Sequence, residues 1–293
     1  MEEVEKGKNK KGKRRLIIFL VFILFLIVGI LLYSRFIAVK RLHVKEYRIV
    51  NENLKEIHGY KIAHLSDIHF GKTTTSSDLK KIVTKINLTK PDILIFTGDL
   101  IDKDTKLTEK MKEEIENILK TIDKTILKYC IKGEDDLKFS SYDFIMENAG
   151  FVSLDDTYKT LYIDKDNFFF LAGLKSTKDA SSIEGRLGDV KQFISTLEKR
   201  PMYSIFVMHE PDFVDMIDTD SFNLVLAGHS HGGQVQIPFL GGIIYPKYAT
   251  KHHQNYSKIG NTDFYISSGI GTTTYGFRLF NPPSFNLYRL VSY

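Results

Sequence analysis

The sequence predicts an α/β protein in which strands and helices form packed layers, preceded by one membrane-spanning helix. From about residue 58 onward, short apolar runs alternate with amphipathic helical patterns, which is typical of a layered α/β architecture. An uncharged apolar segment near the N-terminus approaches the length that a bilayer requires. The chain has 293 residues, of which 43% are hydrophobic and 26% are charged, so we expect one large globular domain behind this segment.

Short apolar runs are the expected strands, and several of them end on a polar residue or a glycine. They cover residues 61–66, 93–97, 125–131, 168–172, 204–208, 223–227, 264–267 and 286–291. Helices are expected between them, because apolar residues repeat at helical spacing within 79–86, 107–122 and 190–197. Pro91 and Pro201 follow the first and the third of these helices, where proline prevents helical continuation.

The N-terminal region predicts a membrane anchor. Residues 1–15 form a basic tail that holds +4 of the formal net charge of +5, and residues 16–34 form the transmembrane segment. A cleaved signal peptide and a buried helix are the alternatives, but residues 34–38 lack the small-residue pattern of a cleavage site. Lysine and arginine are denser before this segment than after it. We therefore expect a single-pass protein of the cell membrane, with a cytoplasmic N-terminus and the folded domain on the extracytoplasmic side.

The remaining chain divides into a juxtamembrane segment, residues 35–57, and the folded domain, residues 58–293. Outside the basic tail the charges nearly cancel, which argues against nucleic acid as a partner because such proteins need a broad basic surface. The single cysteine, Cys130, lies in an apolar run and is expected to pack in the core. The oligomeric state is left open.

Polar residues that follow the expected strands predict a metal site. They are Asp67, His69, Asp99, His209, His229 and His231. Ligands bind at the carboxyl ends of strands in open α/β sheets, and a spacing of two puts each neighbouring pair on one face of an extended chain. Four imidazoles and two carboxylates suit Mn, Fe, Zn or Co, and six protein ligands suit two divalent ions better than one. The histidines outside this pattern are expected to be structural or surface residues: His43, His58, His64, His252 and His253.

Four ordered motifs resemble those of the calcineurin-like metallophosphoesterases. They are His-Leu-Ser-Asp-Ile-His at 64–69, Thr-Gly-Asp at 97–99, His-Glu-Pro-Asp at 209–212 and Gly-His-Ser-His-Gly-Gly-Gln at 228–234. The last motif, the Ser-Gly-Ile-Gly at 268–271 and the Pro282-Pro283 pair resemble the membrane-anchored bacterial branch of that superfamily. The likeness extends over roughly residues 58–293, and four motifs in order are far more specific than any one of them.

The resemblance implies a four-layer α/β/β/α sandwich with a pair of metals between its sheets. In this scheme Asp99 bridges the ions, one site takes Asp67, His69 and His231, and the other takes His209 and His229. It also implies hydrolysis of a phosphodiester or a pyrophosphate by a hydroxide that both metals activate. A membrane tether suits a lipid-linked or envelope substrate, which is an expectation from family analogy.

One motif departs from the family pattern. The family has Gly-Asn-His-Asp after its third strand, whereas this chain has Gly-Glu-Asp-Asp at 133–136. Glu134 replaces the Asn ligand and is expected to bind metal through its carboxylate, while Asp135 is a weak replacement for the catalytic His. We therefore expect substrates with good leaving groups, such as pyrophosphates. The alternative is a catalytically weak or inactive metal-binding membrane module.

Overall fold

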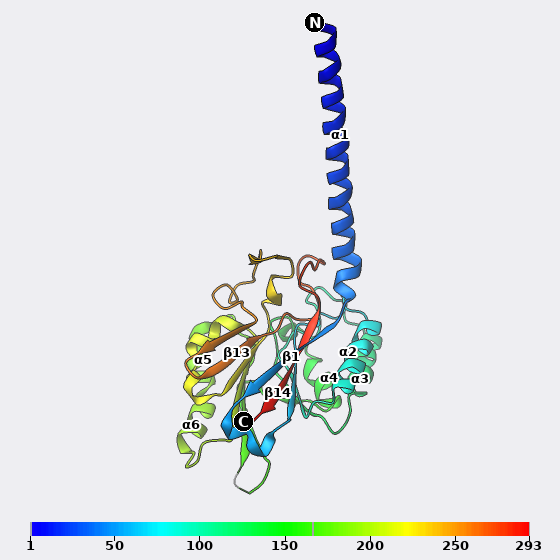
Figure 1. Cartoon of the computed structure of the whole chain (residues 1–293). Coiled ribbons are helices and arrows are strands. Elements are labelled where there is room, and N and C mark those ends of the chain that lie inside the picture. The colour runs from blue at the N-terminus through cyan, green and yellow to red at the C-terminus, as the bar shows by residue number, and fades with distance from the viewer. Residues whose placement is uncertain (1, 166, 293) are drawn as a thin grey trace.

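A computed structural model describes residues 2–165 and 167–292. Figure 1 shows a body in which two sheets pack face to face and helices cover their outer faces, with the long helix α1 (Glu2–Leu32) projecting away from the body. The predicted α/β architecture is confirmed, and its layers follow the order helix, sheet, sheet, helix.

Each main sheet contains six strands. The first has the order β1 (His43–Val50), β14 (Ser284–Val291), β2 (Lys61–Leu65), β3 (Ile93–Phe96), β4 (Leu127–Cys130) and β5 (Val152–Ser153). The second has the order β12 (Tyr256–Ile259), β13 (Thr262–Ile266), β9 (Leu224–Ala227), β8 (Tyr203–Met208), β7 (Phe168–Leu174) and β6 (Tyr158–Tyr162). A short ribbon pairs β10 (Gln236–Ile237) with β11 (Gly241–Gly242). Within the main sheets, β2, β3 and β4 run parallel, as do β7, β8 and β9, so their carboxyl ends face the same way within each sheet.

Three apolar clusters hold the layers together. The helices α2 (Ser76–Thr89), α3 (Glu109–Leu119) and α4 (Tyr142–Asn148) bury side chains such as Ile86 and Ile115 against the first sheet. A second cluster fills the space between the sheets, and a third lies between the second sheet and α5 (Ile183–Arg186) with α6 (Gly188–Thr196). Burial of these apolar faces is what fixes the sheets in position.

The expected strands are all present, but the first sheet extends into the segment assigned to a juxtamembrane linker. Strand β1 lies within residues 35–57 and pairs in parallel with β14 from His43 opposite Ser284 to Val50 opposite Val291. It is an edge strand in which half of the side chains are exposed and four of eight are charged or histidine, so its sequence is too polar to indicate a strand. The sheet therefore begins before residue 58. The short strands β5, β6 and β12 are also absent from the sequence prediction.

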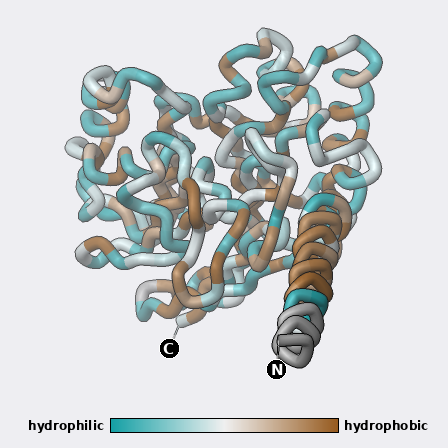
Figure 2. Tube along the Cα trace, turned by 90° about the horizontal axis from the view of Figure 1, so that it is seen from above, coloured by the Kyte–Doolittle hydropathy of each residue, from teal (hydrophilic) through white to brown (hydrophobic). Residues whose placement is uncertain are grey.

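Helix α1 carries exposed apolar side chains on every side from Leu16 to Leu32, and Figure 2 shows them as one hydrophobic stretch. In the described part of the chain, this is the one helix long and apolar enough to cross a membrane. Its lower end is fastened to the body. Ser34 Oγ donates to the carbonyl oxygen of Arg278 at 2.9 Å, and the Arg278 backbone N–H donates to the Ser34 carbonyl oxygen at 3.2 Å.

Candidate metal centre

The predicted metal ligands converge where strands of the two sheets end side by side. In the first sheet, Asp67 and His69 follow β2 and Asp99 follows β3. In the second sheet, His209 follows β8, and His229 and His231 follow β9. All six side chains are buried, so the structure brings together in the interior a set of groups that normally avoid it.

Five of these residues have a left-handed backbone. The φ angles are 53° at Asp67, 45° at His69, 61° at Asp99, 64° at His229 and 49° at His231. Side chains other than glycine rarely adopt this conformation, which costs about 1–3 kcal/mol at each residue. Such strain persists only where the surrounding structure holds it, and it concentrates at functional sites. The sharp turns after β2, β3 and β9 thus aim the ligands at a common centre.

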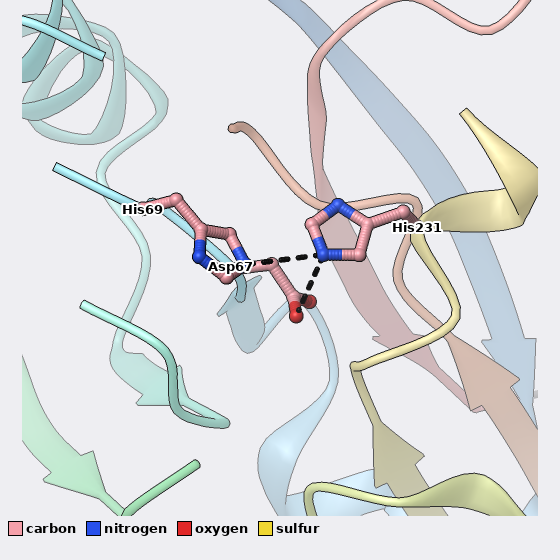
Figure 3. A group of neighbouring side chains, drawn as sticks. All are labelled: Asp67, His69 and His231. Atoms are coloured by element: carbon pink, nitrogen blue, oxygen red, sulfur yellow. Dashed lines mark hydrogen bonds and ion pairs between the residues drawn. The ribbon is translucent and has the colours of Figure 1, made fainter. Parts of the chain in front are cut away.

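One group consists of Asp67, His69 and His231. Figure 3 shows the three side chains pointing toward one another. The Nε2 atoms of His69 and His231 lie 3.1 Å apart, and His231 Nε2 lies 3.4 Å from Asp67 Oδ1. The backbone N–H of His229 donates to the Asp67 carboxylate at 3.1 Å, which fixes its direction. Two ring nitrogens and a carboxylate oxygen can bind one ion from this arrangement.

A second group consists of Asp99, His209 and His229. His209 Nδ1 donates to the Thr97 carbonyl oxygen at 2.7 Å, so in the neutral imidazole Nε2 carries no proton, and Nε2 lies 3.3 Å from Asp99 Oδ2. His229 Nε2 donates to the Lys247 carbonyl oxygen at 2.9 Å, so its Nδ1 is the nitrogen that remains for a metal. Both imidazoles are oriented through their outer nitrogens, as in metal-binding histidines generally.

Asp99 connects the two groups. Its Oδ2 lies 3.3 Å from His209 Nε2 in the second group and 3.6 Å from His69 Nε2 in the first. Burial alone raises the pKa of the Asp99 carboxyl, but the His209 and His69 imidazoles lower that pKa well below its usual range. Burial lowers the pKa of His209, yet the Asp99 charge raises it well above its ordinary value. The ionised carboxylate therefore needs positive charge on both sides.

The donor set fits divalent cations. His209 Nε2 is buried without a hydrogen-bond partner although it points at the Asp99 carboxylate. An ion held by these residues would satisfy this nitrogen and would supply positive charge around Asp99 without protonating the imidazoles. Imidazole and carboxylate ligands suit Mn, Fe, Zn and Co.

The turns that carry Asp99 require two glycines. Gly98 has a φ of 98°, and a Cβ there would collide with the backbone of Gly133, whose own Cβ would collide with Asp99. The Asp136 carboxylate ties these turns together, because it accepts hydrogen bonds from the backbone N–H of Asp99 at 2.7 Å, Leu100 at 2.8 Å and Gly133 at 2.9 Å. Burial and the nearby charge of Asp99 raise the pKa of Asp136 to about 7.

Asp135 lies behind His69, one of the predicted metal ligands. Its Oδ2 lies 3.3 Å from His69 Nδ1, and its backbone N–H donates to Asp99 Oδ1 at 2.8 Å. Asp102 is buried beside it, with Oδ2 3.7 Å from the same His69 nitrogen. Sequence reasoning missed Asp102, although it follows Asp99 by three residues in Gly-Asp-Leu-Ile-Asp. The two carboxylates face a ring nitrogen that is turned away from the first group of ligands.

Glu134 lies at the edge of the centre. Its side chain is 40% exposed and its carboxylate forms an ion pair with Lys178 at 3.6 Å. Among the described residues, the groups of ligand atoms close enough to share an ion do not include Glu134. Metal binding by Glu134 stays a prediction that requires a different side-chain rotamer.

Arg278 is a second buried residue that sequence reasoning missed. Its guanidinium donates to the carbonyl oxygens of Gly271, Ser268 and Asn281, and lies 3.5 Å from His231 Nδ1. Burial, His69 and Arg278 together lower the pKa of His231 well below its usual value. One feature of the sequence could have indicated this buried residue. Arg278 is the one charged residue in an otherwise uncharged run, Tyr-Gly-Phe-Arg-Leu-Phe at 275–280.

His64 lies close to the centre but belongs to the core. It bonds to Tyr288 Oη at 3.2 Å and to Thr97 Oγ1 at 2.9 Å, and burial lowers its pKa to about 3. It is therefore a neutral, satisfied histidine, as expected for a structural residue.

A sequence model of the calcineurin-like phosphoesterase domain matches residues 60–233, which is more than half of the chain and includes all six buried ligands. The chain belongs to the calcineurin-like phosphoesterase family. It is a metallophosphoesterase, and the family uses divalent metal ions at its active site. The resemblance of the four motifs is thereby confirmed.

Bacterial members of the family align over most of this metallophosphoesterase. The metallophosphoesterase YkuE of Bacillus subtilis is 30% identical, and the alignment covers 89% of each chain. The UDP-2,3-diacylglucosamine pyrophosphatase LpxG of Chlamydia muridarum is 25% identical, with 80% of this chain and 84% of LpxG covered. The phosphodiesterase YaeI of Escherichia coli is 23% identical, with 79% of this chain and 82% of YaeI covered.

Proposed function

We propose that this metallophosphoesterase is anchored in the cell membrane by α1 and hydrolyses a phosphodiester or pyrophosphate bond with two divalent transition-metal ions. The observation that carries the proposal is the carboxylate of Asp99, which lies between two groups of buried ligands and within 3.6 Å of an imidazole from each. A pair of metals bridged by one carboxylate needs this arrangement.

The residues have separable roles in this proposal. Asp67, His69 and His231 hold one ion, His209 and His229 hold the other, and Asp99 contacts both. When bound, two such cations lower the pKa of water and neutralise charge on the phosphoryl oxygens. The hydrogen bonds that His209 and His229 donate to the carbonyl oxygens of Thr97 and Lys247 keep both rings in the tautomers that metal binding requires.

Position 135 favours substrates that need no proton on the leaving oxygen. Asp135 faces His69 and the Lys103 backbone N–H, and a carboxylate held near cations is a poor proton donor. Phosphates with stable leaving groups, such as pyrophosphates and aryl diesters, should therefore be hydrolysed faster than simple alkyl phosphates. We propose a lipid-linked or envelope substrate, because α1 confines the site to the membrane surface and the relative LpxG is named for a lipid-linked pyrophosphate.

The test uses the full chain in detergent, loaded with Mn. Elemental analysis should find two metal ions per chain, and an activated aryl phosphodiester should be hydrolysed. Asp99→Asn should lower metal content toward one ion and activity by more than about 100-fold, while Asp189→Asn on the exposed face of α6 should change neither. Equal activity of the Asp99→Asn protein, or folded wild type that binds no ion under any loading condition, contradicts the proposal.

A catalytically weak metal-binding module remains the second candidate, because Glu134 pairs with Lys178 instead of joining the buried ligands. Restoring the family residues with Glu134→Asn/Asp135→His discriminates between the two. A wild type that binds two ions but hydrolyses no phosphoester, together with a hydrolytically active double variant, supports the module.

A further inference from the structure

An apolar cavity of about 490 Å³ touches both the metal centre and the membrane helix. Its lining includes the metal ligand His231 and its neighbour Ser230, and it also includes Ile30 and Leu31 in the last turn of α1. The rest of the wall comes from residues of the loops at 233–246 and 273–279. The volume lies within the range of ~300–1,000 Å³ that is common for small-molecule pockets.

Helix α1 is attached to the body at its base, so the wall that it contributes to the cavity is fixed. Ser34 lies in the π-helical turn that follows α1, Tyr33–Ile37; it is buried and bonds to the backbone of Arg278 in both directions. The Arg278 guanidinium in turn lies beside His231. The base of α1 and the metal centre are therefore held by the same segment, and the cavity between them has a fixed wall on each side.

The loops around the cavity present apolar side chains to solvent on the side from which α1 leaves. Figure 1 shows loops that precede β12 and β14 close to the base of α1. Their large exposed apolar residues are Ile237, Phe239, Leu240, Ile243, Ile244, Tyr275 and Phe280. Exposed apolar groups gathered in this way mark a contact with a membrane or a partner, and their continuity with α1 indicates the membrane. The cavity therefore opens at the bilayer surface.

We propose that the cavity is a subsite for one alkyl or acyl chain of an amphiphilic phosphoester or pyrophosphate. The phosphate lies at the metal centre beside His231, and the chain extends past Val235 and Leu279 toward Ile30 and the bilayer. This inference rests on the proposed function and deepens it, because it assigns the substrate class to lipids that stay partly inserted while they are hydrolysed.

The cavity strengthens binding of the substrate because it keeps the alkyl or acyl chain of the substrate out of water. A chain that moves from a bilayer into an apolar cavity changes its surroundings little, whereas each methylene forced into water lowers affinity by about fourfold. Filling the cavity should therefore penalise long-chain substrates and spare short ones. A side chain that displaces three methylenes should reduce long-chain activity by about 60-fold.

The first experiment compares two substrates that share one reacting centre, p-nitrophenyl dodecyl phosphate and p-nitrophenyl methyl phosphate. The full chain is used in phosphatidylcholine nanodiscs with Mn. Val235→Trp should lower the ratio of kcat/KM for dodecyl over methyl by at least about tenfold. Leu88→Trp, on the exposed face of α2, should leave that ratio unchanged. A Val235→Trp protein with the wild-type melting temperature and the wild-type ratio overturns the subsite and leaves the hydrolase intact.

The second experiment needs no substitution and no turnover. A hexadecylphosphonate with a diazirine in its chain is photoactivated in the same nanodiscs, and labelled residues are found by mass spectrometry. We expect labels within 243–246 and 273–279, reduced at least fivefold by excess methylphosphonate, and labels on the outer face of α1 that methylphosphonate does not change. Absence of cavity labels, or cavity labels that methylphosphonate leaves unchanged, overturns the subsite. If the wild-type protein hydrolyses neither the dodecyl nor the methyl substrate, that result contradicts the proposed function and not the subsite.

Discussion

In three of the imidazoles around the metal centre, those of His69, His209 and His229, one nitrogen faces an acceptor of the protein and the other is turned inward. His209 and His229 use backbone carbonyls for this purpose, whereas His69 faces the carboxylates of Asp135 and Asp102. A carboxylate behind a ligand histidine makes that ligand more basic and fixes its tautomer. Asp135 is thereby placed to orient a ligand, a role that differs from the leaving-group protonation expected of a histidine at this position.

Asp135→Asn should lower metal affinity about 10–100-fold at constant side-chain size. The measurement is competition for Mn or Zn with a chelator of known affinity, carried out on the full chain in detergent. Asp189→Asn serves as the matched control on an exposed surface. An unchanged metal affinity in both Asp135→Asn and Asp135→Asn/Asp102→Asn contradicts this role.

Removing the metals should destabilise the folded chain. Binding to the native state alone contributes about 2.7 kcal/mol at a metal concentration 100 times Kd, which for a domain of this size corresponds to roughly 5–10 °C in melting temperature. The Asp99 carboxylate is buried at 4% exposure and loses its divalent partners on removal. Thermal unfolding with Mn and with excess chelator measures the difference, and a superposition of the two curves contradicts it.

At the scale of elements, β1 brings a lysine into the interior. Lys45 on β1 donates to Ser268 Oγ at 2.8 Å, and burial, together with the Arg278 charge, lowers its pKa from 10.5 to about 8. Below pH 8 the ammonium is protonated in both states, so the folded state bears the full cost of burying it. Between pH 8 and 10.5 only the unfolded chain retains the proton, and that cost disappears as pH rises.

Lys45→Met should therefore stabilise the chain by up to about 3 kcal/mol at pH 7 and should have little effect near pH 10.5. Melting temperatures of wild type and variant at pH 7, 8.5 and 10 give the comparison. The difference in melting temperature between the two proteins should become smaller as pH rises. A difference in melting temperature that grows with pH, or a variant less stable than wild type at pH 7, contradicts a cost of burying the Lys45 ammonium.

Most strands could be predicted from the sequence because they are buried on both faces and bounded by turn residues, as in Ile93–Phe96 and Leu224–Ala227. Strand β1 could not, because an edge strand with exposed side chains has no apolar signature. The six buried ligands were predictable because each follows such a strand. The positions of Asp102 and Glu134 were not, since they depend on how loops from separate strands pack against one another.

The apolar cavity also could not be predicted from the sequence. Its wall joins the end of α1 to loops more than 200 residues later in the chain, including Leu279. No periodicity connects such segments. Their proximity follows from the two hydrogen bonds between Ser34 and Arg278, which are features of the folded chain alone.

At the scale of the whole molecule, the orientation across the membrane can be tested with cysteines. The one native thiol, Cys130, is buried, and burial raises its pKa far above the usual range, so it should not react. In intact cells, Glu184→Cys on the exposed face of α5 should react with a membrane-impermeant maleimide, whereas Lys13→Cys should react only after lysis. The reverse pattern contradicts the predicted orientation.

The parallel pairing of β1 with β14 sets a constraint on biogenesis. Strand β14 ends two residues before the C-terminus, yet it lies between β1 and β2 inside the first sheet. This sheet therefore cannot close until β14 has been synthesised and has inserted between β1 and β2. A chain without β14 would expose the facing edges of β1 and β2, and unpaired strand edges can pair with other chains. The strand that follows α1 thus depends on β14 for its pairing with the first sheet.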